Sequence, residues 1–467
     1  MVMRSINPAT EEVVESFQEF SPQDVDRVLQ QSHDAARAWR TTSFGERSAR
    51  LQAVARILRT QKASWAELIT REMGKPIVEA EAEVEKCAWN CDFYAEHAPR
   101  FLADERYETG AQESFVAFEP LGVVLAIMPW NFPFWQVLRF AAPALMAGNG
   151  AVLKHASNVP RCALAIEQII TQAGLPDGLF RTLMLPGSAV ATVIADPRIS
   201  AVTLTGSSEV GENVASLAGK HIKKQVLELG GSDPFVVLDD ADIDAAAKVA
   251  ARARNQNSGQ SCIAAKRFIV ETGVAEEFTT KFAAAVQALQ VGDPFERSTN
   301  VGPLARGDLR ETLQRQVEES LARGAHAVTG GGPIDRKGYY YAPTVLDEVS
   351  LEMPAFREEM FGPVAAVIPA KDADDAVTLA NDTEYGLGAN LWSRDIERAK
   401  SLARRIEAGS VFINGMVTSD PRLPFGGVKR SGYGRELSHY GIREFTNIQT
   451  IVVGATVPPK PQSTPSE

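Results

Sequence analysis

The chain has 467 residues, which is too long for one simple domain, so two or three domains are expected. Its composition, 45% hydrophobic with 35 glycines and 26 prolines, is that of a soluble globular protein rich in turns. The formal net charge is -11, and no dense run of lysine and arginine occurs, which argues against nucleic-acid binding.

The sequence also argues against membrane and metal sites. No apolar run is long enough to cross a bilayer, and no signal-peptide pattern opens the chain. The four cysteines are sparse, which suits a reducing compartment, and no second cysteine pair lies near Cys87 and Cys91 to complete a zinc site. We expect a cytoplasmic protein without a metal.

The first hundred residues predict helices. Ser21-Pro22 followed by Asp24 is typical of a helix start, because serine caps the helix and proline fits its first position. Helical spacing continues over residues 46–61, 64–73 and 78–96. The polar, roughly alternating stretch 104–119 predicts an exposed hairpin that could hold a partner subunit by extending a sheet.

From residue 121 onward, short apolar runs alternate with helical segments. This alternation predicts a parallel sheet covered on both faces, which binds ligands at the carboxyl ends of its strands. The expected strands are 122–128, 151–153, 182–185, 201–205 and 225–229, and the expected helices are 135–147, 159–173, 188–195 and 208–218.

The same alternation then restarts and predicts a second α/β unit. Its expected strands are 235–238, 267–271, 364–369, 389–392 and 410–414, and its expected helices are 242–254, 274–289, 373–380 and 396–408. Residues 449–454 are strand-like, and the tail 457–467 is rich in Pro, Ser and Gln, which predicts a flexible end.

Cys262 ends a polar loop between an expected helix and an expected strand. The loop reads Asn-Gln-Asn-Ser-Gly-Gln-Ser-Cys from residue 255 to 262. A thiolate is the reactive form of cysteine, and backbone amide dipoles or a helix end lower the pKa of the thiol. Most lone cysteines are small buried hydrophobes, so the loop alone leaves both interpretations open.

Two further polar residues stand where expected strands end. Asn131 lies between prolines in Pro-Trp-Asn-Phe-Pro, which would hold its amide as a donor to an oxyanion, although a turn asparagine is the alternative. Glu228 lies in an apolar strand end, where burial would raise its pKa and suit it as a general base. A salt-bridged glutamate at a sheet edge is the alternative.

A glycine fingerprint for a dinucleotide, G-x-G-x-x-G after the first strand, is absent. Gly206 and Ser207 instead open the helix expected at 208–218, and its free amides could bind a phosphate. An ordinary helix cap is the alternative reading of these two residues.

The order of these motifs along the chain resembles the NAD(P)-dependent aldehyde dehydrogenase superfamily. Two more motifs carry the resemblance, Glu-Glu-Met-Phe-Gly-Pro-Val at 358–364 and Pro-Phe-Gly-Gly-Val-Lys at 424–429. It covers nearly the whole length and implies an α/β fold with a variant Rossmann cofactor domain (1–103 and 120–229) and an α/β catalytic domain (230–444). It further implies a small β oligomerisation element (104–119 and 445–456) and a homodimer or homotetramer.

The resemblance assigns catalytic roles to three residues. Cys262 is the expected nucleophile, and Asn131 with the Cys262 backbone amide forms the expected oxyanion hole. Glu228 is expected to activate the water that hydrolyses the thioester, so the product is a free acid and no coenzyme A is needed.

The resemblance also implies a cofactor site. Its residues are Trp130, Lys154, Ser157, Gly206, Ser207, Leu229, Glu359 and Phe361. Lys154 is expected at the adenosine ribose, Ser207 at the pyrophosphate and Glu359 at the nicotinamide ribose. Many NAD-preferring relatives have a glutamate at the position of Ser157, so serine here favours NADP over NAD.

Arg139, eight residues after Asn131, indicates which kind of aldehyde is oxidised. Members that oxidise succinic semialdehyde have an arginine there, which implies a carboxylated substrate bound by Arg139 together with Trp135 and Ser419. A solvent-facing helix arginine is the alternative, although the apolar neighbours of Arg139 make that costly without a partner.

The sequence around Cys262 differs at two positions from that of some of those members. A second arginine six residues before the nucleophile is replaced by Gln256, and the cysteine that can pair with the nucleophile is replaced by Ala264. Gly259 would permit a tight approach to bound substrate. A broad-specificity aldehyde dehydrogenase and a cofactor-free thiol hydrolase using Cys262 remain alternatives.

Overall fold

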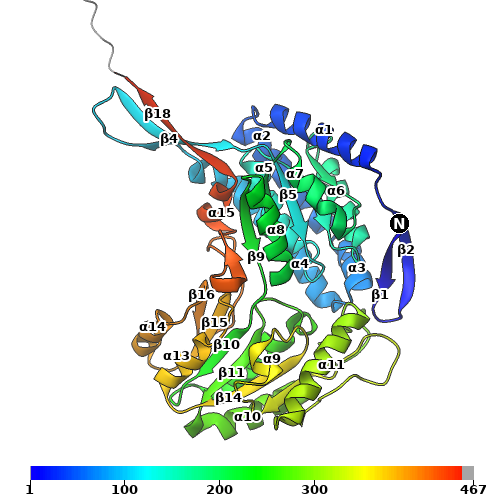
Figure 1. The fold of residues 1–467 in the computed structure, drawn as a ribbon, viewed down its shortest axis with the longest axis vertical. Helices are drawn as coiled ribbons and strands as arrows, with labels where there is room; N and C mark the ends of the chain where they lie inside the picture. Colours follow the sequence, from blue (N-terminus) through cyan, green and yellow to red (C-terminus); the bar gives the residue numbers. More distant parts are fainter. Residues whose placement is uncertain (1, 455–467) are drawn as a thin grey trace, which may run out of the picture.

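The computed structural model describes residues 2–454. Figure 1 shows two lobes, each built around one β-sheet, and an arm of strands that projects from the upper lobe. The expected flexible tail 457–467 lies outside the described residues, as do the last two residues of the expected oligomerisation element.

The upper lobe contains a six-stranded sheet in the order β17-β9-β8-β5-β6-β7. The pairs among β5 to β9 are parallel, as predicted, and β17 adds to β9 in the antiparallel sense. The strands are β5 (Val123–Met128), β6 (Gly150–His155), β7 (Phe180–Thr182), β8 (Ile199–Thr205), β9 (Lys224–Glu228) and β17 (Gly432–Tyr433).

One strand prediction in this sheet was wrong in its bounds. The strand expected at 182–185 is β7, which ends at Thr182. The backbone leaves the sheet there because Leu185 N donates to Leu183 O, a tight turn that ends the extended run although its residues are apolar.

Nine helices of the described chain surround the upper sheet (Figure 1). The predicted cap of the first one is confirmed, because the Ser21 hydroxyl accepts from the Asp24 amide while the Asp24 carboxylate accepts from the Ser21 amide. These helices are α1 (Pro22–Trp39), α2 (Phe44–Thr60), α3 (Lys62–Met73), α4 (Ile77–Phe101), α5 (Trp135–Met146), α6 (Pro160–Gln172), α7 (Val190–Ala195), α8 (Ser208–Lys220) and α15 (Ser438–Glu444).

The lower lobe contains a seven-stranded sheet in the order β12-β13-β14-β11-β10-β15-β16, parallel except for β12. Its strands are β10 (Asp233–Val237), β11 (Ala265–Glu271), β12 (His326–Thr329), β13 (Thr344–Asp347), β14 (Val364–Ala370), β15 (Gly388–Trp392) and β16 (Ser410–Ile413). Its helices are α9 (Ile243–Asn255), α10 (Thr272–Gln287), α11 (Gly307–Ala322), α12 (Pro354–Arg357), α13 (Ala373–Asn381) and α14 (Ile396–Ala403). Sequence analysis predicted the second parallel unit but not α11, β12 or β13.

The predicted hairpin is present in the arm, where β4 (Glu113–Pro120) pairs with both β3 (Glu105–Arg106) and β18 (Thr446–Val453). A second antiparallel pair, β1 (Val2–Asn7) with β2 (Glu12–Gln18), was not predicted. Its second strand is almost wholly exposed, so the alternation of buried and polar residues that reveals a strand is missing there.

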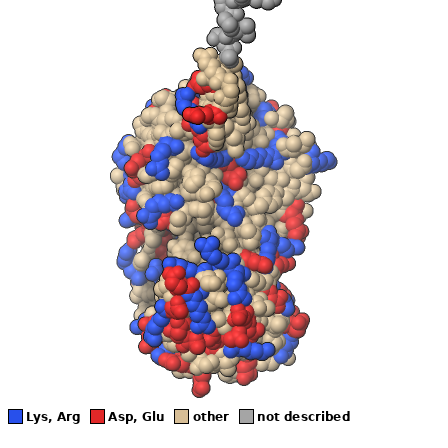
Figure 2. All heavy atoms as spheres, turned by 90° about the vertical axis from the view of Figure 1, so that its left-hand side faces the viewer, with Lys and Arg blue, Asp and Glu red and all other residues tan. Residues whose placement is uncertain are grey.

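The surface carries charges of both signs. Acidic and basic side chains are interspersed over the face shown in Figure 2, with no continuous basic area on it. Within residues 2–454, no helix is both long and apolar enough to cross a membrane.

Candidate active site

A cavity of about 460 Å³ lies where strands β5, β6, β8 and β9 end. Seven of the eight residues predicted to bind the cofactor line it: Trp130, Lys154, Gly206, Ser207, Leu229, Glu359 and Phe361. The eighth, Ser157, is exposed and is not among the residues that line this cavity. The Ser207 hydroxyl caps α8 by accepting from the Val210 amide, so the helix-cap interpretation also applies.

A second cavity of about 280 Å³ contains all three residues predicted to bind substrate, Arg139, Trp135 and Ser419. Gln256, at the position of the missing arginine, lines it as well. Cys262 lines both cavities, and no other side chain is common to the two. The thiol therefore stands where the contents of one cavity would meet the contents of the other.

The loop before Cys262 is held by an unusual run of backbone conformations. Asn257, Ser258 and Gly259 have φ angles of 57°, 54° and 74°, which is the left-handed region. The Asn257 side chain stabilises the turn because its Nδ2 donates to Asn131 O at 2.8 Å and to Gln260 O at 2.9 Å. The side-chain amide of Asn257 thus connects the loop before Cys262 to the Pro-Trp-Asn turn after β5.

Gly259 is required by packing within the protein. A Cβ atom on Gly259 would lie 2.3 Å from the backbone carbonyl of Gly362. The loop therefore packs directly against that segment, and the predicted approach to substrate stays a prediction.

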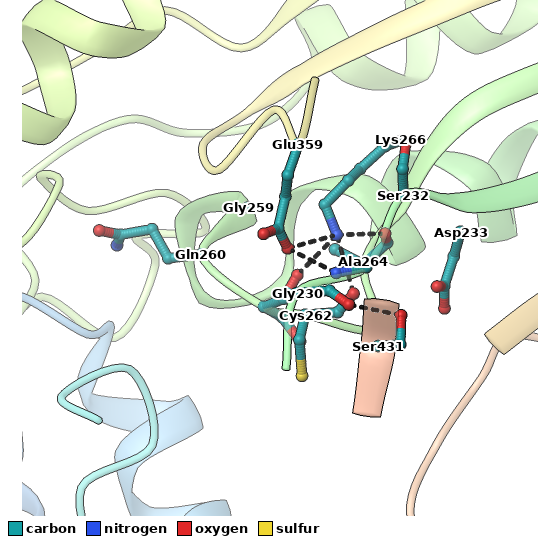
Figure 3. A network of polar contacts seen from close by, with 12 residues as sticks. Gly230, Ser232, Asp233, Gly259, Gln260, Cys262, Ala264, Lys266, Glu359 and Ser431 are labelled. Carbon is teal, nitrogen blue, oxygen red and sulfur yellow. Dashed lines mark hydrogen bonds and ion pairs between the residues drawn. The ribbon is translucent and has the colours of Figure 1, made fainter. Parts of the chain in front are cut away.

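The side chain of Lys266 forms hydrogen bonds to backbone carbonyls of the loop around Cys262 (Figure 3). Its buried ammonium donates to Ser261 O at 3.1 Å, Cys262 O at 2.8 Å and Ala264 O at 3.2 Å, and lies 3.6 Å from Glu359 Oε1. Figure 3 shows the Cys262 sulfur pointing away from this ammonium.

The Lys266 contacts orient the Cys262 backbone amide. In a trans peptide the C=O and N–H bonds point in opposite directions, so the N–H that follows Ser261 O also points away from Lys266. Within residues 2–454 this amide donates to no protein acceptor. It is a free donor beside the thiol.

The predicted oxyanion donor Asn131 is buried and lines the larger cavity. One of its Nδ2 hydrogens goes to Gln260 O at 3.1 Å, which leaves the second free to donate. Asn131 and Cys262 line the same cavity, and two N–H donors of this kind would suit a developing oxyanion there.

Glu228 lies in a buried group of charges with Arg139 and Glu436. Arg139 forms an ion pair with Glu436, and its Nη2 donates to Thr205 Oγ1 at 3.3 Å. Neither oxygen of Glu228 accepts a hydrogen bond in the described chain. Burial raises the pKa of Glu228 to about 8, with Arg139 opposing the rise and Glu436 adding to it.

Burial also raises the pKa of the Cys262 thiol to about 12, while Arg139 and Lys266 lower it and Glu359 and Glu228 raise it. The resting thiol is therefore protonated at neutral pH. Attack on a carbonyl therefore requires a group that accepts this proton.

A family model described as the aldehyde dehydrogenase family matches residues 1–451. The chain belongs to the aldehyde dehydrogenase family. Among similar proteins, a probable succinate-semialdehyde dehydrogenase (NADP+) of Synechocystis sp. is 53% identical over 97% of this chain and 99% of its own length. The Escherichia coli succinate semialdehyde dehydrogenase named for NAD(P)+ is 51% identical over 96% of this chain and 97% of its own.

Solved aldehyde dehydrogenase structures share the fold. The succinic semialdehyde dehydrogenase of Streptococcus pyogenes in complex with NADP+ has a TM-score of 0.95, with 39% identity over 97% of this chain and 100% of that one. The predicted aldehyde dehydrogenase fold is thus confirmed.

Sequence reasoning missed several residues that line the two cavities of this aldehyde dehydrogenase. Lys86 and Glu79 on α4 face the smaller cavity, and Arg306 and Leu309 face the larger one. They lie outside the recognised motifs, and only helical spacing marked α4, so no local signal separated them from ordinary surface residues.

The described residues contain no histidine in either cavity lining and no cluster of three His, Cys, Asp or Glu side chains able to hold a metal. His155, the histidine nearest to the Asn131 motif, is buried, with Nε2 2.9 Å from Pro133 O and Nδ1 accepting from the Ala156 amide. Both ring nitrogens are occupied, so this imidazole is not available to Cys262.

Replacing Gly259 with alanine should destabilise the protein and disturb the nucleophile loop. The left-handed φ and the clash with Gly362 together cost about 3 kcal/mol. Thermal unfolding measures the effect, and Gly273→Ala is the matched control, because a Cβ there meets nothing within 4 Å. Equal unfolding temperatures for the two variants would contradict the packing described for the loop.

Proposed function

We propose that this aldehyde dehydrogenase oxidises succinic semialdehyde, or a similar short carboxylated aldehyde, to the acid with NADP+, and with NAD+ less well. The observation that carries the proposal is the position of Cys262 between two cavities. One holds seven of the eight predicted dinucleotide residues. The other is small and contains the cations Lys86, Arg139 and Arg252 together with Glu79 and Glu83. Relatives named for the same reaction support it.

The residues of the larger cavity suit a phosphorylated dinucleotide. Lys154 provides a cation at the end of β6, and the α8 N-terminus provides backbone amides beside Ser207. Glu359 provides a carboxylate for ribose hydroxyls. The exposed Ser157 carries no negative charge, so it would not repel a 2′-phosphate. In this arrangement residues 1–103 and 120–229 hold the cofactor and residues 230–444 supply the nucleophile.

The chemistry begins with attack of the Cys262 sulfur on the aldehyde carbon, while the thiol proton passes to a base. The carbonyl oxygen becomes an oxyanion held by the Asn131 amide and the Cys262 N–H. A bound nicotinamide supplies a hydride acceptor. Loss of hydride from the tetrahedral carbon leaves a thioester on Cys262.

Hydrolysis then regenerates the thiol. Glu228 takes a proton from water, whose oxygen attacks the thioester carbonyl, and the carbon–sulfur bond breaks to release the free acid. The burial that raises the pKa of Glu228 to about 8 makes its carboxylate a stronger base than an exposed glutamate.

Two alternatives are distinguishable. A broad-specificity aldehyde dehydrogenase would oxidise neutral and carboxylated aldehydes equally well. A cofactor-free thiol hydrolase would need a base such as histidine beside Cys262, and no histidine lines either cavity in the described chain. Formation of NADPH with an aldehyde argues against the hydrolase.

An assay of several aldehydes with NAD+ and NADP+ in parallel tests the proposal. Succinic semialdehyde should have a kcat/KM at least about 10-fold above that of its neutral methyl ester, because the cavity cations bind its carboxylate. NADP+ should give a higher kcat/KM than NAD+. Equal values for acid and ester would favour the broad enzyme, and a higher value with NAD+ would contradict the cofactor preference.

Glu228→Gln should stop turnover after the thioester forms. A burst of about one NADPH per active site, followed by very slow release of acid, is expected in rapid-mixing experiments. In the wild-type enzyme the hydrolytic step should speed up as the pH rises through about 8, because the basic form of Glu228 predominates only above its raised pKa. A variant that turns over at the wild-type rate with the same pH profile would remove Glu228 from this role.

The protein should form a homodimer or homotetramer through the arm. Strand β18 is an open sheet edge, and its side chains Ile448 and Val452 are 62% and 57% exposed in one protomer. Light scattering after size exclusion should show an oligomer that Ile448→Lys with Val452→Lys converts to smaller species. Ile222→Lys, a change at an exposed apolar residue outside the three arm strands, should leave the mass unchanged. A monomeric wild type would exclude this assembly.

A further inference from the structure

The smaller cavity contains a cation that no sequence motif indicated. Lys86 projects from α4 into the cavity, and its Nζ donates to the Ser419 hydroxyl at 2.7 Å. The same ammonium lies 4.4 Å from the centre of the Trp135 ring. Lys86 thus connects two of the three residues predicted to bind substrate.

The other cations near this cavity are already balanced or exposed. Arg139 is paired with the buried carboxylate of Glu436, and Lys75 behind the cavity wall is paired with buried Glu83. Arg252 lines the cavity but is exposed to solvent. Within residues 2–454, Lys86 has no carboxylate at ion-pair distance, and Glu83 and Asp420 act on its charge only from further away.

The surroundings of Lys86 explain how such a charge is tolerated. The Trp135 ring face attracts the ammonium and partly replaces a counter-ion. Because the Ser419 hydroxyl accepts from Lys86, its own hydrogen remains free to donate to another oxygen. An ammonium and a hydroxyl donor side by side suit a carboxylate.

We infer that Lys86, with Ser419, binds the carboxylate of the aldehyde substrate and supplies the cation that Gln256 does not provide. Gln256 lines the same cavity from the nucleophile loop and is uncharged, whereas Lys86 comes from a distant helix. This inference rests on the proposed carboxylated substrate. It makes Lys86 a specificity-determining residue, and it leaves Arg139 to hold Glu436 near the general base as well as to line the cavity.

Substitution of Lys86 by methionine tests the inference, because methionine keeps the apolar stem and removes the charge. The KM for succinic semialdehyde should rise about 10- to 100-fold, as expected for the loss of a charge-assisted hydrogen bond. The KM for the neutral methyl ester should change little. Lys86→Arg should keep most of the preference for the acid. Arg100→Gln, at the exposed end of the same helix, is the control.

Three outcomes are separable. If the wild type does not prefer the acid over the ester, the proposed function fails. If the wild type prefers the acid and Lys86→Met keeps that preference, only the role of Lys86 fails. If Arg252→Gln removes the preference and Lys86→Met does not, the exposed guanidinium selects the substrate and the inference is overturned.

The wild-type enzyme provides a second test that does not depend on a variant folding. Burial lowers the pKa of Lys86 to about 8, with Arg139 lowering it further and Cys87, Glu83 and Asp420 opposing this. The ammonium is therefore lost as the pH rises above about 8. The ratio of kcat/KM for acid to ester should fall over that range, since steps common to both substrates cancel in the ratio. Burial raises the pKa of Glu79, in the same cavity, to about 7, so Lys86→Met should keep any fall near pH 7 and lose the fall above pH 8. A ratio that stays constant to pH 10 would contradict the inference.

Discussion

The buried ammonium of Lys266 holds the backbone of the loop around Cys262 in place. Lys266 is fully buried, and its ammonium donates to the backbone carbonyls of Ser261, Cys262 and Ala264. Without it, those carbonyls would be buried and unpaired, which is costly for each group. Since the carbonyls point inward to Lys266, the Cys262 amide and sulfur point outward to the cavities. The same ammonium faces Glu359, so one charge also anchors a side chain of the larger cavity.

The buried charged groups near Cys262 also affect one another's ionisation. Glu228 and Glu436 both lie beside the guanidinium of Arg139, with Arg435 also acting on Glu228, and two buried carboxylates cannot both remain ionised there without cost. Burial raises the pKa of both carboxyls, and Arg139 is engaged by Glu436. Among the described residues, Glu228 has no hydrogen-bond partner, so its carboxyl is free to take up or release a proton. Burial in the core thereby sets the pKa of Glu228.

The division of space around Cys262 separates the two kinds of ligand. The larger cavity lies at the ends of parallel strands, where amides and side chains converge from several loops. The smaller one lies between α4, α5 and the loop around Ser419, and its cations come from helices. Since the two meet at one sulfur atom, their contents can react only there. This geometry supports a two-substrate reaction more strongly than any single residue does.

Much of this protein could be predicted from its sequence. Short apolar runs that alternate with helical segments predicted both parallel units, and a serine–proline start predicted the capped first turn of α1, because buried strands and helix caps have local signatures. The ordered motifs also predicted the family, which the comparison confirms. The roles of Cys262, Glu228 and Asn131 stay predictions, although the structure brings all three segments to one region.

Other features depended on the tertiary structure. The sequence does not reveal that packing brings the chain at Gly362 against Gly259. Arg139 appeared to need a partner, and only the return of the chain at Glu436 supplies one. Lys86 has an ordinary helical context and becomes notable beside Ser419, 333 residues away. The sequence by itself determined local elements and motif order, because these depend on neighbours along the chain. The tertiary structure decided which charges are paired, because that depends on contacts between segments far apart in the sequence.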